Sequence, residues 1–222
     1  MKIGVIVAMD KELQRLQSLF TDGNVMVQKC GIGKVNAALG TQRMIEEFHP
    51  DVIISSGCAG GHGQGIKVQD VVASTQLCYH DVYCGRAIDD STQYGQVQGL
   101  PARYVADQRL VEKAKSLSAH QSLKDAGISV HPGLIVTGDW FVDSKEKMAE
   151  IISHFPDAIA VDMESCAIAQ TCYLAGVPFI SFRVVSDLPL QDTDASQYHN
   201  FWDTVAENSF QVTRTFVESI LS

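Results

Sequence analysis

The stretch AVDMESCAIAQ, residues 160–170, decides the predicted fold. It continues an apolar run from Ala158 that predicts the end of a buried strand, and the small residues from Ser165 onward predict the start of a helix. Two carboxylates and a methionine lie between them. In parallel α/β sheets, ligands bind at the carboxyl ends of strands, and acids held there are costly to desolvate unless they are paired. We therefore expect this strand end to belong to a binding site.

Strands and helices alternate along the rest of the chain. Strands are expected at residues 2–8, 25–29, 51–55, 68–77, 133–136, 158–161 and 178–185. Helices are expected at residues 13–20, 35–48, 107–120, 145–154, from 165 onward and 201–221, with N-caps at Asp107 and at Asp143 or Ser144. Residues 57–61 are expected to form a glycine-rich turn, and residues 87–103 an irregular excursion. The alternation predicts an α/β fold with a single domain, residues 1–222, and three layers (α/β/α) around a central mixed, mainly parallel sheet.

Length and composition limit the class of protein. A chain of 222 residues, 45% of them hydrophobic, can build one sizeable core. The formal net charge of −9 argues against nucleic acid and against a membrane surface as partners, because both favour basic patches. The six cysteines form no CxxC pair and show no histidine spacing typical of zinc, so we expect reduced thiols. The apolar run 3–9 is too short for a signal peptide, and no stretch reaches transmembrane length. We expect a soluble, cytoplasmic protein.

Two glycine-rich segments follow expected strands. Residues 31–34 (GIGK) open a helix but form neither a Walker A loop nor a complete dinucleotide-binding motif, so the sequence favours close strand–helix packing there. Residues 57–61 (GCAGG) either place backbone N–H groups against a ligand or form a flexible junction. The sequence leaves both interpretations open.

Three carboxylates also follow expected strands, and each has a structural alternative. Glu12 is a candidate general base, but an acid in the first helical turn is stabilised by the helix dipole, and the residue alone favours that interpretation. Asp187 follows a buried strand, where partial desolvation suits a carboxyl group to general-acid catalysis; its alternative is a turn residue. Glu164 is a candidate ligand of a vicinal diol, and otherwise a helix-terminal acid. Met163 and Phe141 lie beside such strand ends, where these residue types more often pack in the core.

Six segments together resemble one known family. They are residues 1–12 (MKIGVIVAMDKE), 31–38 (GIGKVNAA), 79–81 (YHD), 137–141 (TGDWF), 161–164 (VDME) and 183–187 (RVVSD). The first two resemble the purine nucleoside phosphorylase/hydrolase superfamily, and the last two are similar to its 5′-methylthioadenosine/S-adenosylhomocysteine nucleosidases. The resemblance covers nearly the whole chain. It implies a nucleoside phosphorylase-like fold and hydrolysis of the N-glycosidic bond of adenine thionucleosides, with no metal and no cofactor.

The resemblance also implies roles for individual residues. Asp187 would protonate adenine N7 and Glu12 would activate the attacking water, as an oxocarbenium-like transition state requires. Glu164 would hold the ribose hydroxyls, with Met163 packed against the sugar, and Ser186 would support Asp187. The remaining substrate-binding residues would be Ile32, Cys58, Gly60, Phe141, Val142 and Tyr198, with Phe141 stacked on adenine and the Val142 backbone bonded to it. Members of this family form homodimers whose subunits complete each other's pocket, so we expect a homodimer.

Several positions depart from the family pattern. Cys58 stands where the nucleosidases carry a serine near the ribose and the water, and Asp162 replaces the usual glutamate. Residues 21–30 form a shorter segment than usual, and residues 89–99 lack the aromatic pattern that lines the 5′-alkylthio pocket. Tyr198 takes the place of a phenylalanine on a mobile lid. These departures keep the catalytic pair but leave open which 5′ substituent is bound, and whether Asp162 is structural or marks a different substrate.

Three other functions compete with this one. A phosphorylase should carry arginines at its phosphate-binding strand ends, and here those ends offer only Lys34. A nucleosidase for another 5′-modified nucleoside, such as a futalosine-like substrate, would keep the same catalytic pair. A non-catalytic nucleoside-binding or storage protein would have no need to retain Glu12, Glu164 and Asp187 together.

Overall fold

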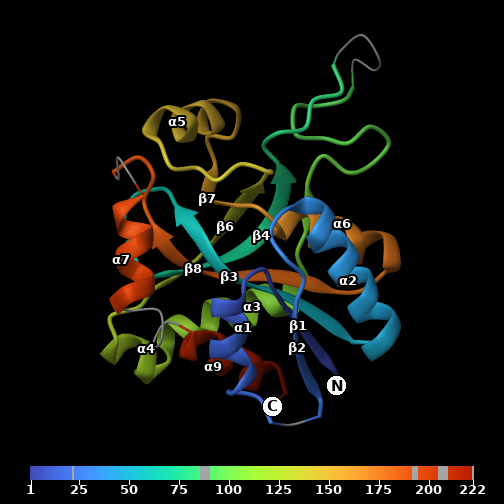
Figure 1. Cartoon of the computed structure of the whole chain (residues 1–222), viewed down its shortest axis with the longest axis vertical. Helices are drawn as coiled ribbons and strands as arrows, with labels where there is room; N and C mark the ends of the chain where they lie inside the picture. Colours follow the sequence, from blue (N-terminus) through green and yellow to red (C-terminus); the bar gives the residue numbers. More distant parts are fainter. Residues whose placement is uncertain (22, 86–90, 192–194, 205–209, 222) are drawn as a thin grey trace.

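An eight-stranded mixed sheet forms the centre of the molecule (Figure 1). The computed structural model describes residues 1–21, 23–85, 91–191, 195–204 and 210–221. The strands are β1 (Ile3–Val7), β2 (Val25–Lys29), β3 (Val52–Gly61), β4 (Val71–Tyr79), β5 (Tyr104–Val105), β6 (Val130–Thr137), β7 (Ala158–Asp162) and β8 (Phe179–Asp187). Five strand pairs are parallel and three, β3–β7, β4–β5 and β4–β8, are antiparallel. The predicted mixed, mainly parallel sheet is thus confirmed.

Part of this sheet closes into a ring. β8 pairs with both β3 and β4, while β7 pairs with both β3 and β6, so that β3, β8, β4, β6 and β7 follow one another around a circle. Gly60 near the end of β3 is paired with Val161 of β7 on one side and with Asp187 of β8 on the other. The ring therefore brings the ends of three strands, and the acids that follow or end them, to one place.

Helices cover both faces of the sheet (Figure 1). They are α1 (Asp10–Gln17), α2 (Lys34–Phe48), α3 (Gln108–Ser116), α4 (Gln121–Asp125), α5 (Lys145–His154), α6 (Ser165–Ala175), α7 (Ser196–Thr204) and α9 (Gln211–Leu221). Successive side chains of a strand point to opposite faces. Accordingly, Ile3, Val5 and Val7 of β1 belong to the core cluster that contains residues of α1, α3 and α9, whereas Ile6 belongs to the cluster with α2 and α6. This arrangement confirms the three predicted layers.

One element was predicted wrongly. Residues 57–61 were expected to form a turn, but they continue β3, which runs to Gly61 and carries a bulge between Ala59 and Gly60. Glycine commonly interrupts strands, yet here it allows close packing inside the ring. A Cβ atom on Gly60 would lie 3.0 Å from Pro189 Cγ, and one on Gly61 would lie 2.7 Å from Val185 Cγ1.

Other expected elements differ in their bounds. The helix expected at 107–120 stops at Ser116 and is followed by a 3-10 turn (Leu117–Ala119). The extended backbone of His120 then separates this turn from α4. Its expected cap is confirmed, since the Asp107 carboxylate accepts from two backbone N–H groups. Ser144, and not Asp143, caps α5. The helix expected at 201–221 corresponds to α7 and α9, and its residues 205–209 lie outside the described residues.

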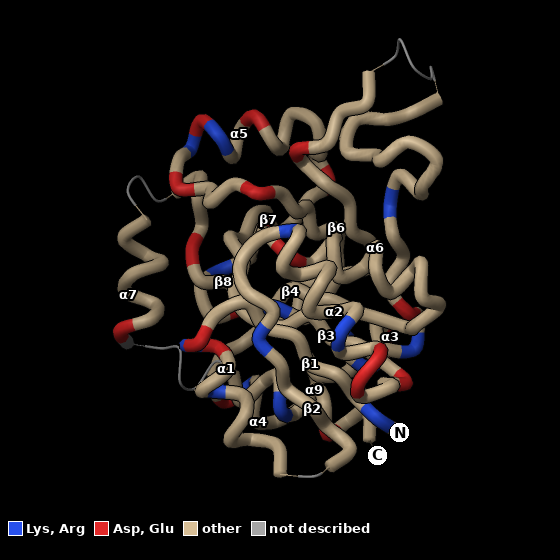
Figure 2. Tube along the Cα trace, turned by 45° about the vertical axis from the view of Figure 1, so that its right-hand side comes forward, with Lys and Arg blue, Asp and Glu red and all other residues tan. Residues whose placement is uncertain are grey.

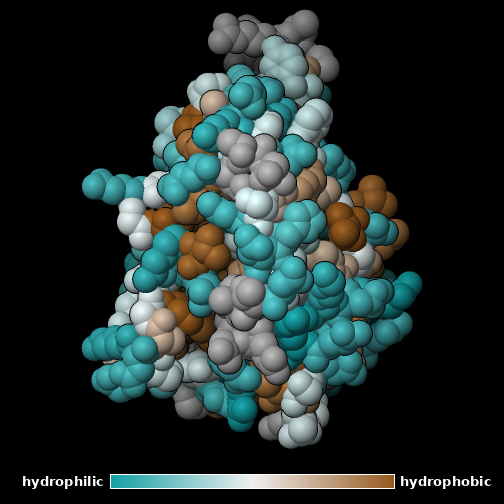
Figure 3. All heavy atoms as spheres, turned by 60° about the vertical axis from the view of Figure 1, so that its left-hand side comes forward, coloured by the Kyte–Doolittle hydropathy of each residue, from teal (hydrophilic) through white to brown (hydrophobic). Residues whose placement is uncertain are grey.

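The surface excursion is irregular, as expected, in its described part. Residues 91–103 contain no helix and no strand, and residues 86–90 lie outside the described residues, including Asp89 and Asp90 of the segment compared with the 5′-alkylthio pocket. Figure 2 shows acidic and basic residues interspersed along the chain, and Figure 3 shows small groups of apolar residues set among polar ones on one face. Among the helices described, none is both long and apolar enough to cross a membrane.

Candidate active site

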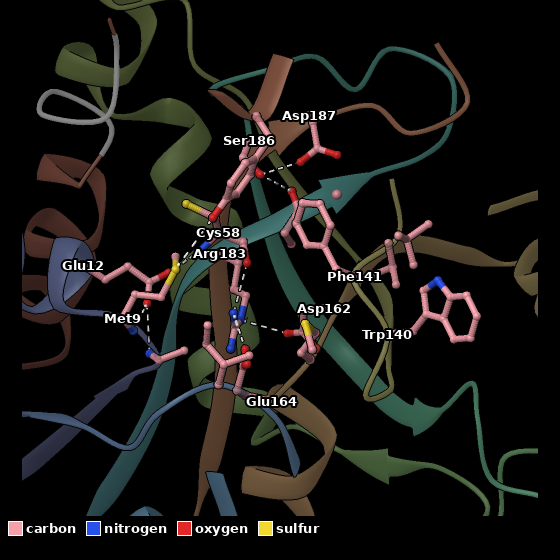
Figure 4. A pocket seen from close by; sticks show the side chains of 18 residues that line it. Met9, Glu12, Cys58, Trp140, Phe141, Asp162, Glu164, Arg183, Ser186 and Asp187 are labelled. Atoms are coloured by element: carbon pink, nitrogen blue, oxygen red, sulfur yellow. Dashed lines mark hydrogen bonds and ion pairs between the residues drawn. The ribbon is translucent and has the colours of Figure 1, made fainter. Parts of the chain in front are cut away.

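One pocket lies where β1, β3, β7 and β8 end (Figure 4). All eleven residues predicted for the site line it: Glu12, Ile32, Cys58, Gly60, Phe141, Val142, Met163, Glu164, Ser186, Asp187 and Tyr198. Seven further lining residues had no predicted role there: Ala8, Met9, Ala59, Trp140, Val161, Asp162 and Arg183. The structure therefore brings together side chains that the sequence distributes over nearly 190 positions.

Arg183 of β8 lies at the base of this pocket and is only 2% exposed. Its Nε lies 2.8 Å from Asp162 Oδ2 and donates to Ser165 Oγ at 3.0 Å. Its Nη1 donates to the Cys58 carbonyl oxygen at 3.0 Å and to Glu164 Oε2 at 3.2 Å. A buried charge is tolerated only when it is paired and hydrogen-bonded. Arg183 meets this condition by contacting β3, the end of β7 and the start of α6.

Asp162 is fully engaged with protein groups. Its Oδ1 accepts from Thr137 Oγ1 at 2.6 Å and from the Ser165 backbone N–H at 3.2 Å. Its Oδ2 accepts from Ser165 Oγ and faces Arg183. The backbone N–H at the start of α6 and the buried cation both favour a negative charge here. These contacts support the structural interpretation of Asp162.

Glu164 connects Arg183 to another helix. Its Oε2 accepts from Arg183, and its Oε1 accepts from the Gly33 backbone N–H at 3.0 Å, directly before α2. Burial raises the pKa of the Glu164 carboxyl group, while Arg183 and the Gly33 N–H act in the opposite direction. The side chain reaches the pocket from the loop between β7 and α6 (Figure 4).

Glu12 is buried in the first turn of α1, and its carboxylate points back to the strand ends. Oε2 accepts from the backbone N–H groups of Ala8 and Met9, both at 2.9 Å, and Oε1 accepts from that of Cys58 at 3.1 Å. Burial raises the pKa of Glu12, although Arg183 and the three N–H donors oppose the shift. Gly57 allows this approach, because a Cβ atom there would lie 2.4 Å from Glu12 Oε1.

Asp187 ends β8 on another side of the pocket from Glu12 (Figure 4). Its Oδ1 accepts from Ser186 Oγ at 2.6 Å, and the same hydroxyl lies 3.4 Å from the Ala59 carbonyl oxygen. Both residues are buried but line the pocket. This hydrogen bond holds the Ser186 hydroxyl group against the Asp187 carboxyl group.

Aromatic residues form a third side of the pocket. Phe141 is about half exposed, and its ring meets that of Tyr198 edge-on, with 5.2 Å between centroids. Tyr198 of α7 also contacts Met9 through its hydroxyl group, 3.7 Å from Sδ. Trp140 lies beyond Phe141, with Lys147 Nζ 4.5 Å from its ring centroid (Figure 4). The exposed ring of Phe141 offers a planar surface for a planar ligand.

Cys58 lines the pocket, and its backbone bonds both Glu12 and Arg183. Its backbone N–H donates to Glu12 and its carbonyl oxygen accepts from Arg183, so the residue is held at both ends. Burial, followed by the negative charge of Glu12, raises the pKa of the Cys58 thiol well above its ordinary value. The side chain is therefore a neutral thiol, which donates hydrogen bonds more weakly than a serine hydroxyl.

Arg183 and Lys34, two cations at or near the pocket, are both paired with acids. Among the described residues that line it, Arg183 is the only lysine or arginine, and it is paired with Asp162 and Glu164. Lys34, the other candidate, donates to both Asp81 carboxylate oxygens at 2.8 Å and lies 3.7 Å from Asp139. No group of three or more His, Cys, Asp or Glu in the described ranges is arranged to hold a metal ion.

Comparison with known proteins bears directly on this site. The phosphorylase superfamily profile matches residues 2–218. A curated 5′-methylthioadenosine/S-adenosylhomocysteine nucleosidase from Exiguobacterium is 42% identical over 94% of this chain and 94% of the relative. One from Geobacillus thermodenitrificans is 36% identical over 100% of this chain and 98% of the relative. This chain belongs to the 5′-methylthioadenosine/S-adenosylhomocysteine nucleosidase family.

Solved structures of nucleosidases in this family share its fold. The Neisseria meningitidis enzyme, in complex with methylthio-immucillin-A, superposes with a TM-score of 0.87 at 38% identity, covering 98% of this chain and 99% of that one. The Colwellia psychrerythraea enzyme, in complex with adenine, gives a TM-score of 0.87 at 32% identity, covering 99% and 95%. The predicted nucleoside phosphorylase-like fold is thereby confirmed.

Arg183 was not among the residues predicted for this nucleosidase pocket. The residue lies inside the quoted segment RVVSD, but it was given no function. A signal was present, because an arginine in the middle of the apolar run FISFRVVSD must be buried and therefore needs acidic partners. The two unexplained acids of the 160–170 stretch were those partners.

We expect Arg183→Met to lower the free energy of unfolding by about 3–5 kcal/mol, because it leaves Asp162 and Glu164 buried without a countercharge. Arg183 lowers the pKa of Glu164 against the raising effect of burial, so the Glu164 carboxyl group of the folded variant holds a proton more readily than that of the folded wild type. The deficit should therefore shrink as the pH falls. Urea unfolding at neutral and mildly acidic pH measures both effects.

Arg103→Met is the matched control, because Arg103 pairs with Asp157 at the surface. Loss of an exposed pair should cost less than about 1 kcal/mol. A cost for Arg183→Met as small as that of the control would show that the buried network does not stabilise the fold.

Proposed function

We propose that this protein hydrolyses the N-glycosidic bond of adenine thionucleosides, such as methylthioadenosine and S-adenosylhomocysteine, and releases adenine. The observation that carries the proposal is the meeting of Glu12, Glu164 and Asp187 on different sides of one pocket beside Phe141. The names of the relatives and the adenine bound in the Colwellia structure support it. We assign the catalytic function to the chain as a single domain.

Proton transfer is assigned to two of these acids. Asp187 protonates N7 of adenine, so that the base leaves as a neutral molecule, and Ser186 keeps the Asp187 carboxyl group oriented. Glu12 accepts a proton from the attacking water. Its raised pKa makes it a stronger base than an ordinary carboxylate, while three backbone N–H groups fix its direction. Such an acid and such a base each contribute about 10²–10⁴-fold to the rate.

Substrate binding is assigned to the other residues. Glu164 accepts hydrogen bonds from the ribose hydroxyls, and its negative charge favours the oxocarbenium-like sugar of the transition state. Met163, Gly60, Ile32 and Cys58 contact the ribosyl part, and Cys58 gives the water a weaker partner than a hydroxyl group would. Phe141 stacks on adenine, the Val142 backbone hydrogen-bonds it, and Tyr198 covers the substrate from α7.

The charges of this pocket favour water over phosphate as the attacking nucleophile. Phosphate binding requires cations or free N–H groups. Arg183, the one lysine or arginine among the described lining residues, and Lys34 nearby are already paired with acids. Three buried carboxylates would also repel a phosphate dianion. The same carboxylates, which a purely nucleoside-binding or storage protein would not need, favour an enzyme.

The test is release of adenine from methylthioadenosine, S-adenosylhomocysteine, 5′-deoxyadenosine, adenosine, inosine and futalosine, each with and without phosphate. We expect adenine from the thionucleosides at a rate that phosphate does not change. Asp187→Asn should lower kcat about 10²–10⁴-fold with an unchanged circular dichroism spectrum. Strictly phosphate-dependent release would contradict hydrolysis, and a wild-type rate in the variant would remove Asp187 from the mechanism.

We further propose that the protein forms a homodimer through α2 and α6, which lie side by side (Figure 1). Val35, Leu39, Tyr173 and Leu174 on these helices are more than half exposed, and α6 contains no charged residue. Apolar side chains gathered in this way mark protein interfaces. Ile32, at the start of the same surface, also lines the pocket, so that a second subunit would border the site.

Leu39→Asp should convert the dimer into a folded monomer, because it places a charge within this apolar surface. Sedimentation velocity measures the change. Leu221→Asp on α9, also an exposed leucine, is the control and should remain a dimer. A wild-type monomer, or a Leu39→Asp dimer, would contradict this interface.

We also propose a cytoplasmic location. All six cysteines are free thiols in the structure, which suits a reducing compartment.

A further inference from the structure

Helix α2 begins without a side-chain cap of its own. Its N-cap residue is Gly33, which has no side chain to accept the first backbone N–H groups. Carboxylates from two other loops take this place: Glu164 Oε1 accepts from the Gly33 N–H at 3.0 Å, and Asp139 Oδ1 accepts from the Lys34 N–H at 2.8 Å. Free N–H groups and the helix dipole both favour negative charge at this end. The start of α2 therefore joins the loop after β7 to the loop after β6.

Glycine is required for this junction. Gly33 has a φ of 92°, a conformation that other residues rarely adopt, and a Cβ atom there would lie 2.9 Å from Asp139 Oδ1. The close approach of Asp139 thus depends on the second glycine of the GIGK segment. The sequence had suggested close strand–helix packing for these glycines, and in the structure Gly33 makes room for a carboxylate.

Asp139 is itself held in place at two points. Its backbone N–H donates to Asp81 Oδ2 at 2.8 Å, and Asp81 accepts from Lys34 Nζ through both oxygens at 2.8 Å. Lys34 Nζ lies 3.7 Å from Asp139 Oδ2. The Asp139 side chain is 48% exposed, so its charge pairing alone is weak. The bonds to backbone N–H groups are what fix its geometry.

This arrangement connects the two halves of the proposed ligand site. Glu164, assigned to the ribose, lies on the loop after β7, and Phe141, assigned to the base, lies two residues beyond Asp139 on the loop after β6. A short path joins the two loops: the Gly33 N–H donates to Glu164, and the N–H of the next residue, Lys34, donates to Asp139. A change in Asp139 would alter where Phe141 lies relative to Glu164.

We propose that Asp139 is a positioning residue that sets the separation between Glu164 and Phe141, and so favours ligands that contain both ribose and base. The inference rests on the proposed function of the pocket as a nucleoside site. A ligand that spans two fixed contacts gains affinity because the second contact is pre-organised, whereas a ligand that meets only one contact gains nothing. Asp139 should therefore matter for a nucleoside and not for a free base.

The test uses 9-deazaadenosine and its free base, 9-deazaadenine. In the nucleoside a carbon–carbon bond replaces the bond to be hydrolysed, so the ligand stays intact during the measurement. Calorimetry gives the Kd of each for the wild type and for Asp139→Ala, Asp139→Asn and Asp157→Ala. We expect Asp139→Ala to weaken 9-deazaadenosine on the order of tenfold, the size of one lost charge-assisted hydrogen bond, and 9-deazaadenine less than about twofold. Asp139→Asn keeps an acceptor for the Lys34 N–H and should lie between Asp139→Ala and the wild type.

Asp157→Ala is the control, because Asp157 is similarly exposed and also pairs with a cation, Arg103, but lies before β7, at the opposite end of that strand from Glu164. It should change neither Kd. Equal weakening of both ligands by Asp139→Ala would show a general structural effect and overturn the proposal, as would no change in either. If Asp139→Ala does not fold, the same criterion applies to Asp139→Asn. A wild type that binds neither ligand would contradict the proposed function itself.

Discussion

A buried guanidinium group is the constraint on which the pocket depends. Arg183 lies in a strand that is buried along its whole length, and a cation there is stable only if acids and carbonyl groups surround it. Asp162, Glu164, Ser165 and the Cys58 carbonyl oxygen fill these positions. These partners belong to β3, to the end of β7 and to the start of α6, whereas Arg183 itself belongs to β8. The need to neutralise its charge therefore fixes the ends of β3, β7 and β8 relative to one another.

Arg183 is also connected to the three acids that we assign to proton transfer and to ribose binding. Cys58 accepts from Arg183 through its carbonyl oxygen and donates to Glu12 through its N–H, so the proposed base is oriented by the backbone that the cation holds. Glu164, the proposed ribose ligand, accepts from Arg183 and from the backbone N–H at the start of α2. The next N–H of α2 donates to Asp139, so the network includes that residue as well. Asp187 reaches the pocket at the end of the strand that carries Arg183. The proposed acid, base and sugar ligand are thus positioned by one connected network.

The sequence predicted the layers and the set of pocket residues better than it predicted this network. Buried strands, helical periodicity and the caps at Asp107 and Ser144 are local signals, and the structure bears them out. The continuation of β3 through residues 57–61 was missed because glycine usually ends a strand, whereas here the ring holds it by pairing on both sides. The partners of Arg183 and the cap that Asp139 provides to α2 join residues far apart in the chain, which local patterns do not report.

The central claim is that this pocket directs water at the sugar carbon that bears adenine. Turnover of methylthioadenosine in water enriched in oxygen-18 tests it directly, with mass spectrometry of the sugar product. The account predicts one heavy oxygen in methylthioribose from a single turnover, with or without phosphate in the buffer. A sugar phosphate as product, or methylthioribose without the label when analysed before exchange, would contradict it.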